Sequence, residues 1–378
     1  MLLAFCITLM GIQHGIAQNL GESCETFYTN ISGVCTLASK CPLARKEYQM
    51  NGIPPTICKH SGKKLLVCCK DGSSSLTIAA VDRKPVDPRR VSERKCEEYS
   101  QIVYQNGDVK CRNTDDELLV GSENANQGEF AHMAAIGWIG FNDSYVFLCG
   151  GSLISSRFVL TAGHCEKSVR TNEIYPSIVR LGYQILEPKI RDDGNPIDIP
   201  IKEFHRHPLY RSPKRYNDIG LIELNIDVKF NADIRPACLW NKPDFPGYTK
   251  AITVIWGGND TAEEGATNEH PNEHHKVFLS LPDNDYCDAL LENDRNRHWN
   301  GLIESQMCAG ELRGSKRRCQ GISGTPLQLA SKDNKCVYHI IGFISFGLRC
   351  ATPGRPVVYT RVSSYLDWIE SIAWPEAK

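Results

Sequence analysis

The sequence predicts an all-β fold that ends in a single helix, and three observations support this prediction. Short runs of alternating apolar residues recur between glycine, proline and asparagine turns, for example over residues 146–154 and 336–343, and this pattern is typical of β-barrels. The chain contains 17 cysteines, which suits a fold stabilised by disulfides. Near the C-terminus, Leu366, Ile369 and Ile372 share one helical face, which predicts a packed terminal helix.

The N-terminal residues have the pattern of a secretory signal. The apolar run from Leu2 to Met10 is too short to span a bilayer, and the residues from Gly15 to Gln18 suit a cleavage site near Ala17. We therefore expect a signal peptide over residues 1–17 and a secreted, extracellular protein. The alternative is an ordinary buried element, because a basic start is missing. No later apolar run reaches membrane-spanning length.

Length and charge narrow the classes of partner. The 378 residues are enough for about two domains, and 43 basic residues nearly balance 44 acidic ones. This balance argues against a protein that binds nucleic acid or a membrane surface through its net charge. We expect neither kind of partner.

Six of the cysteines lie in a short segment, residues 24–69. Loss of the signal would remove Cys6 and leave sixteen of the 17 cysteines, an even number in an oxidising compartment. A segment this short buries too little apolar surface to be stable alone, so disulfides worth roughly 2–4 kcal/mol each are expected. Fifteen connectivities are possible for six cysteines. The Cys-x-x-Cys pairs typical of zinc sites are missing, so we predict no metal and no cofactor. The segment is either a domain with a purely structural role or a domain that docks onto a partner.

The composition changes after this segment. Residues 71–75 and 81–90 are polar, contain proline and show no period, which predicts a linker. We assign residues 70–118 to this linker and to the segment that follows it.

Three separated motifs carry the residues of a nucleophilic site. Thr161-Ala162-Gly163-His164-Cys165 comes first, Asn217-Asp218-Ile219-Gly220-Leu221 second, and Cys319-Gln320-Gly321-Ile322-Ser323-Gly324-Thr325-Pro326 third. In this order the motifs resemble those of chymotrypsin-like serine proteases. The clustered cysteines resemble the CLIP domain of arthropod serine proteases. The resemblance implies a chymotrypsin-like double β-barrel over residues 119–378, preceded by a CLIP domain over 24–69.

The resemblance also implies roles for individual residues. His164, Asp218 and Ser323 would form the catalytic triad, and the backbone N–H groups of Gly321 and Ser323 would form the oxyanion hole. Arg317, Val357 and Gly347 would line the specificity pocket. The activation bond would join Leu118 to Leu119, because Leu119-Val120-Gly121 matches a mature protease start. A leucine before that bond is a feature of the snake-like subgroup and implies a different upstream activating protease from the one that cuts after Arg or Lys in most relatives.

The same resemblance implies the disulfides. The implied pairs are Cys24–Cys68, Cys35–Cys58, Cys41–Cys69, Cys96–Cys238, Cys149–Cys165, Cys287–Cys308 and Cys319–Cys350, which leaves Cys111 and Cys336 for one another. The pair Cys96–Cys238 would tie the light chain to the protease domain after cleavage. Glycosylation sequons begin at Asn30, Asn142 and Asn259.

The terminal helix has its own expected contacts. Ser364 to Asp367 resembles a capping box. The apolar stripe of the helix is expected to pack on the second barrel.

Departures from the family pattern surround the predicted nucleophile. Ile322 replaces the carboxylate that pairs with the new N-terminus, Arg317 stands at the pocket base, and Val357 and Thr325 replace glycines. We expect impaired catalysis, because a buried ammonium without its partner costs several kcal/mol. In the alternative interpretation Ile322 simply fills a small apolar gap.

Two functions follow. The first is a secreted CLIP-domain endopeptidase of an extracellular cascade in immunity or development, acting on protein substrates or on cascade proteases. The second is a non-catalytic homologue that acts as a binding cofactor in such a cascade.

Overall fold

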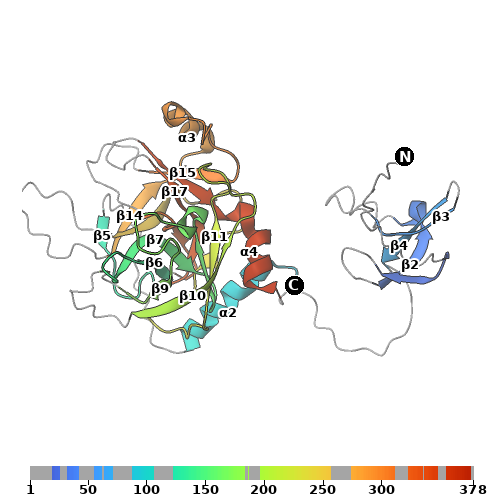
Figure 1. The fold of residues 1–378 in the computed structure, drawn as a ribbon, viewed down its shortest axis with the longest axis horizontal. Coiled ribbons are helices and arrows are strands. Elements are labelled where there is room, and N and C mark those ends of the chain that lie inside the picture. Colours follow the sequence, from blue (N-terminus) through green and yellow to red (C-terminus); the bar gives the residue numbers. More distant parts are fainter. Residues whose placement is uncertain are drawn as a thin grey trace, which may run out of the picture. The chain divides into compact units, whose positions relative to one another are not determined.

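The computed structural model divides into two compact units, residues 1–87 and 88–378 (Figure 1). The structure describes residues 19–25, 32–41, 55–61, 64–70, 87–105, 122–183, 186, 196–256, 274–310, 322–334, 336–347 and 355–375. Several predicted features lie outside these residues. They are the signal peptide, Leu118, Leu119, Gly321, Arg317, Cys111, Cys319, Cys350, Asn30 and Asn259. None of the described helices combines the length and the apolar character needed to cross a membrane.

The N-terminal unit is a small antiparallel sheet held by disulfides. Its four strands lie in the order β1-β2-β4-β3. Their bounds are Ser23–Glu25, Ser32–Leu37, Ile57–Ser61 and Lys64–Lys70 for β1 to β4, with a 3-10 turn at Ala38–Lys40. The bonds are Cys24–Cys68, Cys35–Cys58 and Cys41–Cys69, with S–S distances of 2.10, 1.99 and 2.06 Å. These pairs match those that the resemblance implies. Cysteines supply most of the buried side chains in this unit, which explains its dependence on crosslinks.

The first part of the larger unit is a closed barrel. Its strands follow the order β10-β11-β8-β7-β6-β9. Their bounds are Met133–Ile139 (β6), Tyr145–Leu153 (β7), Phe158–Thr161 (β8), Ile178–Leu181 (β9), Ile197–Arg206 (β10) and Gly220–Leu224 (β11). Most residues of β6, β8 and β11 are buried, so burial along these strands is more continuous than the alternation that the sequence pattern predicts. A 3-10 turn, Gly163–Glu166, follows β8.

The second part is an eight-stranded sheet. Seven strands follow the order β15-β18-β17-β16-β13-β14-β5, and the eighth, β12, pairs with β17. The bounds are Ser122–Asn124 (β5), Cys238–Leu239 (β12), Lys250–Trp256 (β13), His274–Ser280 (β14), Gln306–Ala309 (β15), Pro326–Ala330 (β16), Tyr338–Phe346 (β17) and Val357–Arg361 (β18). Helix α3, Asn284–Leu290, and a 3-10 turn, Glu292–Asp294, connect β14 to β15. The Asp283 side chain caps α3 by accepting from the Tyr286 N–H.

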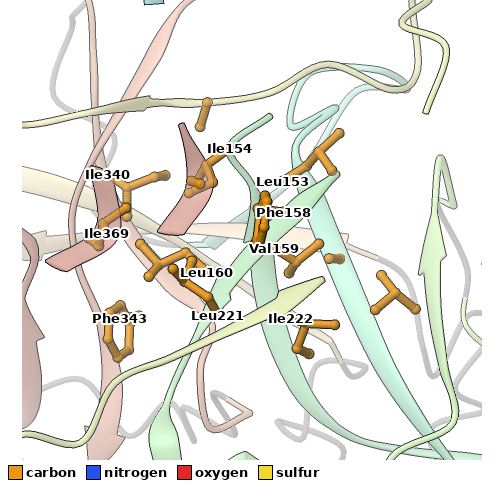
Figure 2. Packing of buried hydrophobic residues seen from close by; sticks show 14 of the residues in the cluster. Leu153, Ile154, Phe158, Val159, Leu160, Leu221, Ile222, Ile340, Phe343 and Ile369 are labelled. Carbon is orange, nitrogen blue, oxygen red and sulfur yellow. The ribbon is translucent and has the colours of Figure 1, made fainter. Parts of the chain in front are cut away.

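The predicted C-terminal helix is present as α4, Leu366–Ala373, but two expected details are wrong. Its N-cap is Tyr365, which makes no side-chain cap bond, because a 3-10 turn at Val362–Tyr365 leads directly into the helix. Leu366 and Ile369 are buried in a cluster that consists mainly of first-barrel residues, together with Ile340 and Phe343 of β17 (Figure 2). The helix therefore packs where the two halves meet, and not on the second barrel alone.

A helix that the sequence analysis did not predict lies inside the expected linker. Helix α2, Val91–Gln105, belongs to the larger unit. Its first residue is buried in the same apolar cluster as α4, and Cys96 forms a disulfide with Cys238. Tyr99 accepts a hydrogen bond from the Trp374 indole at 3.1 Å. Burial raises the pKa of Tyr99 to about 12.

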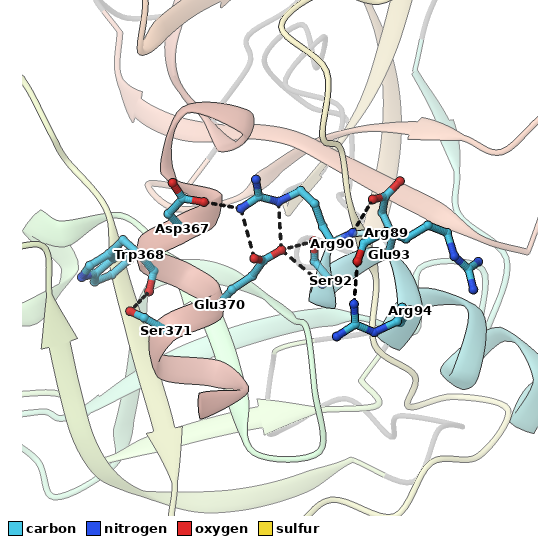
Figure 3. Close-up of polar contacts among 9 residues, drawn as sticks. All are labelled: Arg89, Arg90, Ser92, Glu93, Arg94, Asp367, Trp368, Glu370 and Ser371. Carbon is cyan, nitrogen blue, oxygen red and sulfur yellow. Dashed lines mark hydrogen bonds and ion pairs between the residues drawn. The ribbon is translucent and has the colours of Figure 1, made fainter. Parts of the chain in front are cut away.

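A buried carboxylate joins α2 to α4 (Figure 3). Glu370 is only 6% exposed and accepts from Arg90 Nε at 3.1 Å and Arg90 Nη2 at 3.0 Å. It also accepts from the backbone N–H and the hydroxyl of Ser92, at 3.2 and 2.7 Å. Asp367 adds a contact to Arg90. We call Arg90, Ser92 and Glu370 the helix clasp.

Candidate active site

The predicted histidine lies at the start of a short 3-10 turn that directly follows a buried strand. His164 occupies this turn after β8. The neighbouring Cys165 forms a disulfide with Cys149 of β7, so the turn is covalently fixed to the barrel. Side-chain exposure of His164 is 30%, which leaves the ring accessible from the cleft described below.

Asp218 fixes the imidazole ring. The carboxylate is 2% exposed, and it accepts from the His164 backbone N–H at 2.8 Å and contacts His164 Nδ1 at 2.8 Å. Ser345 Oγ donates to the same carboxylate at 2.5 Å, and Thr360 Oγ1 donates to the Asp218 backbone carbonyl at 2.9 Å. With Nδ1 facing a carboxylate, Nε2 is the nitrogen available to a nucleophile.

The residue before the aspartate has an unusual backbone. Asn217 adopts φ 55°, a left-handed conformation that asparagine tolerates better than most residues. Its side-chain oxygen accepts from the Tyr365 hydroxyl at 3.1 Å. The segment that leads into α4 thus helps to hold the aspartate in place.

Ser323 approaches the histidine from the other half of the molecule. Its carbonyl accepts from the Gly150 N–H at 2.8 Å, and the next N–H, of Gly324, donates to the Ile344 carbonyl at 2.8 Å. Gly324 has φ +79°, and a Cβ there would stand 2.3 Å from both the Gly150 carbonyl oxygen and Thr161 Oγ1. Only glycine fits beside this serine.

His164 and Ser323 line one open cleft of about 550 Å³. Other residues of its wall come from the loop around 293–299 and from the end of β17, with Ser345 and Phe346 in the strand and Gly347 directly after it. Ser323 Oγ and His164 Nε2, which are both described, form no hydrogen bond with each other. Two members of the predicted triad therefore share one cleft, and the third, Asp218, contacts His164.

Ile322 lies in an apolar environment. It packs against a buried cluster that includes Phe130, Met133 and Tyr183, at the position where a charged residue was expected from the family pattern. Thr325, another departure, is 1% exposed, and among the described residues its hydroxyl has no hydrogen-bond partner. The loop that carries Ser323 is therefore held on one side by apolar contacts.

The two described residues of the predicted specificity pocket face each other. Val357 is 9% exposed, and its Cγ2 and Cγ1 atoms lie 3.1 and 3.3 Å from the point where a Cβ on Gly347 would stand. The valine side chain therefore occupies space beside the wall formed by Gly347. A long substrate side chain has less room here than it would have beside a glycine at position 357.

Sequence reasoning missed several residues of this site. Ser345 and Thr360 contact Asp218, but the sequence analysis gave neither residue a role, because neither belongs to the three motifs. Arg215 lines the cleft as well, and its position three residues before Asp218 was the available signal.

These features define a class of protein. A closed barrel supplies a His–Asp pair, a second sheet supplies a serine in the same cleft, and this arrangement is that of chymotrypsin-like serine proteases. The sequence profile of the trypsin family matches residues 119–369. The chain belongs to this family.

Individual relatives agree with this assignment. Serine protease snk of Drosophila melanogaster is 35% identical over 368 residues, which cover 94% of this chain and 79% of that protein. Serine protease Hayan of the same species is 40% identical over 264 residues, 68% of this chain and 39% of that protein. CLIP domain-containing serine protease B10 of Anopheles gambiae is 31% identical over 373 residues, 92% of this chain and 93% of that protein.

Proposed function

We propose that the chain is a secreted serine endopeptidase of an extracellular proteolytic cascade, with catalysis impaired at the oxyanion site. The observation that carries this proposal is the His164–Asp218 pair in one cleft with Ser323. Relatives named proclotting enzyme and phenoloxidase-activating factor 3 support a cascade role. The substrates and partners proposed are therefore proteins, including other cascade proteases and an upstream activating protease.

The proposed chemistry is acyl transfer. Ser323 Oγ attacks the scissile carbonyl, and His164 Nε2 takes the serine proton and returns it to the leaving amine. Asp218 stabilises the imidazolium through Nδ1, while Ser345 holds the carboxylate. The N–H groups of Gly321 and Ser323 are the proposed oxyanion donors.

Impairment follows from the residue beside the nucleophile. Ile322 presents no charge to an N-terminal ammonium, so cleavage gains no ion pair that could order the oxyanion donors. Loss of one such donor slows acyl transfer by roughly 100 to 1000-fold. The apolar contacts of Ile322 offer a different anchor for the loop. Ile322 packs against this apolar cluster whether it impairs catalysis or only fills a gap. The two interpretations differ in whether Ser323 reacts as a nucleophile.

Labelling with a fluorophosphonate tests the proposal. The probe reacts with a nucleophilic serine and needs no specificity pocket. We expect the cleaved protein to be labelled at Ser323 at roughly a hundredth or less of the rate of an ordinary trypsin-like protease. Ser323→Ala is the control and should remove the signal. Labelling as fast as that of an ordinary protease would contradict impairment.

A non-catalytic binding cofactor is the second candidate. The observations that favour it are the apolar setting of Ile322 and the side chain of Val357 beside Gly347. Complete failure of labelling under conditions in which the His164 site is folded would select this function over the first.

Activation by cleavage gives a testable prediction. We expect limited proteolysis to cut the Leu118–Leu119 bond, which follows the acidic run Asp115-Asp116-Glu117. Because Cys96 is bonded to Cys238, the cleaved protein should run as one band on a non-reducing gel and as two bands after reduction. Mass spectrometry of the reduced fragments identifies the bond that was cut. Release of the light chain without reductant would contradict this prediction.

Substrate choice gives another prediction. Residual activity should not favour Arg or Lys before the scissile bond, because Arg317 is proposed at the pocket base and Val357 narrows the wall beside Gly347. Small or acidic residues should be preferred. Val357→Gly should raise cleavage after larger residues by about tenfold, the effect of one or two methylenes of pocket space. A substrate library dominated by cleavage after arginine would show that the pocket is wrongly placed.

Secretion is proposed together with glycosylation. The Asn142 side chain is exposed on the turn between β6 and β7, and its oxygen accepts from the Ser144 hydroxyl at 2.7 Å. Both residues belong to one sequon. A glycosidase-sensitive shift in the mass of the secreted protein would support both features.

A further inference from the structure

Three basic side chains lie on two neighbouring loops, and one of them lines the cleft. Lys214 and Arg215 precede Asp218 in the loop before β11, and Arg297 follows the 3-10 turn of residues 292–294. The Arg215 N–H donates to the His298 carbonyl at 3.1 Å, and Lys214 Nζ donates to the Arg297 carbonyl at 2.6 Å. These bonds fasten the two loops to each other. We call Lys214, Arg215 and Arg297 the basic rim.

Arg215 is the member of the rim that reaches the cleft. It lines the same cleft as His164 and Ser323. Its guanidinium carbon lies 4.9 Å from the centre of the Phe346 ring, and its carbonyl accepts from Gln306 Nε2 at 2.8 Å. Stacking on an aromatic ring orients the planar guanidinium and leaves its edge available to a carboxylate.

The charges of the basic rim are not neutralised locally. Among the described residues, neither Lys214, Arg215 nor Arg297 forms an ion pair with a carboxylate. The acidic side chain in this wall, Asp294, already pairs with Arg355 at 2.8 Å.

Arg295 also lines the cleft, but it is paired with Asp288 and adds no unpaired charge. One further observation agrees with a positive edge. The pKa of His298 is lowered by desolvation and by the positive charges of Arg297, Lys214 and Arg215. An anionic group that entered the cleft would meet Arg215, whose guanidinium forms no ion pair with the described carboxylates.

We propose that the basic rim binds an acidic segment of a protein partner that lies along the cleft, with one carboxylate on Arg215. Bidentate pairing with a planar guanidinium suits a carboxylate. Phe346, which is partly exposed in the same wall, suits a segment that mixes acidic and apolar residues, whereas Leu291 and Trp299 of that wall are buried. This mixture favours a polypeptide over a sulfated polysaccharide, which carries no apolar side chains.

The chain contains a segment of this chemistry. Residues 113–118 read Asn-Thr-Asp-Asp-Glu-Leu and place three carboxylates before a leucine, next to the proposed activation bond. A peptide of these six residues is therefore a suitable probe. Charge complementarity makes the same segment of a second copy of this chain the occupant that fits.

This proposal shares one assumption with the proposed function, namely that a protein segment binds in the cleft. Its test therefore measures binding separately from catalysis. The fluorescein-labelled peptide 113–118 is titrated with the full chain carrying Ser323→Ala, and anisotropy is followed at two salt concentrations. A second peptide carries Asn and Gln in place of its acidic residues. We expect the acidic peptide to bind at least about tenfold more tightly, with an advantage that shrinks as salt rises.

Variants locate the binding site. Arg215→Gln should weaken binding of the acidic peptide about tenfold or more, and Arg215→Lys should restore part of it, because charge returns without the stacked plane. Lys229→Gln removes an exposed charge outside the cleft and should have no effect. Equal binding of the two peptides, or no effect of Arg215→Gln, would overturn the proposal. Binding of a heparin oligosaccharide but not of the peptide would overturn it as well. Failure of Ser323 labelling would contradict the proposed function and leave these results unchanged.

Discussion

Replacing Ile322 with aspartate is expected to increase fluorophosphonate labelling of the cleaved chain by roughly 100 to 1000-fold, the size of one recovered oxyanion donor. An aspartate at this position can pair with the ammonium of Leu119, which exists only after cleavage. The pair would order the peptide that donates to the oxyanion. The gain should therefore depend on cleavage, and the uncleaved chain should gain little.

The same substitution should destabilise the uncleaved chain. Ile322 packs against Phe130, Met133 and Tyr183, so a carboxylate there would lose water without gaining a partner. We expect the melting temperature of the uncleaved variant to fall by several degrees and cleavage to restore part of the loss. Both quantities can be measured on one preparation before and after cleavage.

A neutral variant separates charge from shape. Ile322→Asn has nearly the size of aspartate but cannot form the ion pair, so it should destabilise the loop without raising labelling. Equal gains from Asp and Asn would show that relief of packing, and not the ammonium pair, limits Ser323. Rapid labelling of the cleaved wild-type chain would show that Ile322 does not impair the reactivity of Ser323. Peptide hydrolysis by Ile322→Asp should recover further when Val357→Gly and Arg317→Asp are added.

Local sequence signals were sufficient for the fold and for the His164–Asp218 pair, because short motifs specify both turns. They were insufficient for Arg215 and Ser345, whose roles depend on strands and loops that meet only in three dimensions. The pocket wall could be predicted in part. The sequence motif identified position 357, but the close approach of Val357 to Gly347 is visible only in the structure. Cysteine spacing alone left fifteen connectivities open for the small domain.

The helix within the expected linker shows why some elements escape prediction. Residues 91–105 have few apolar side chains, and the polar stretch before them gives no helical period. What stabilises α2 lies 275 to 280 residues away in sequence, in the buried carboxylate of Glu370 and the indole of Trp374. Tertiary contacts outweigh weak local preference here.

Loss of the helix clasp is expected to release the light chain once the disulfide is reduced. After cleavage between residues 105 and 122 and mild reduction of Cys96–Cys238, the wild-type light chain should stay bound during size-exclusion chromatography. Glu370 accepts four hydrogen bonds from Arg90 and Ser92, and bonds to a charged group contribute roughly 1.5–3 kcal/mol. Glu370→Gln should therefore weaken retention about 10 to 100-fold.

The neighbouring acidic residue supplies a matched control. Asp367 also contacts Arg90, but its side chain is 96% exposed, and exposed ion pairs contribute little. Asp367→Asn should leave retention nearly unchanged. Immediate loss of the wild-type light chain on reduction would show that the disulfide alone holds the two chains together. Equal effects of Glu370→Gln and Asp367→Asn would show that burial of Glu370 has no special importance.

The place of α2 inside the larger unit also affects how the protein folds. The proposed activation bond lies between α2 and β5, within one folded unit and not between two units. The uncleaved chain can assemble this unit from a single polypeptide in a unimolecular reaction. Once the chain has been cleaved and Cys96 is reduced, α2 must find its site by a bimolecular encounter, whose rate depends on concentration. Refolding of the cleaved, reduced protein should become slower on dilution. A cleaved protein that unfolds and loses this disulfide would therefore regain its structure more slowly than the uncleaved chain.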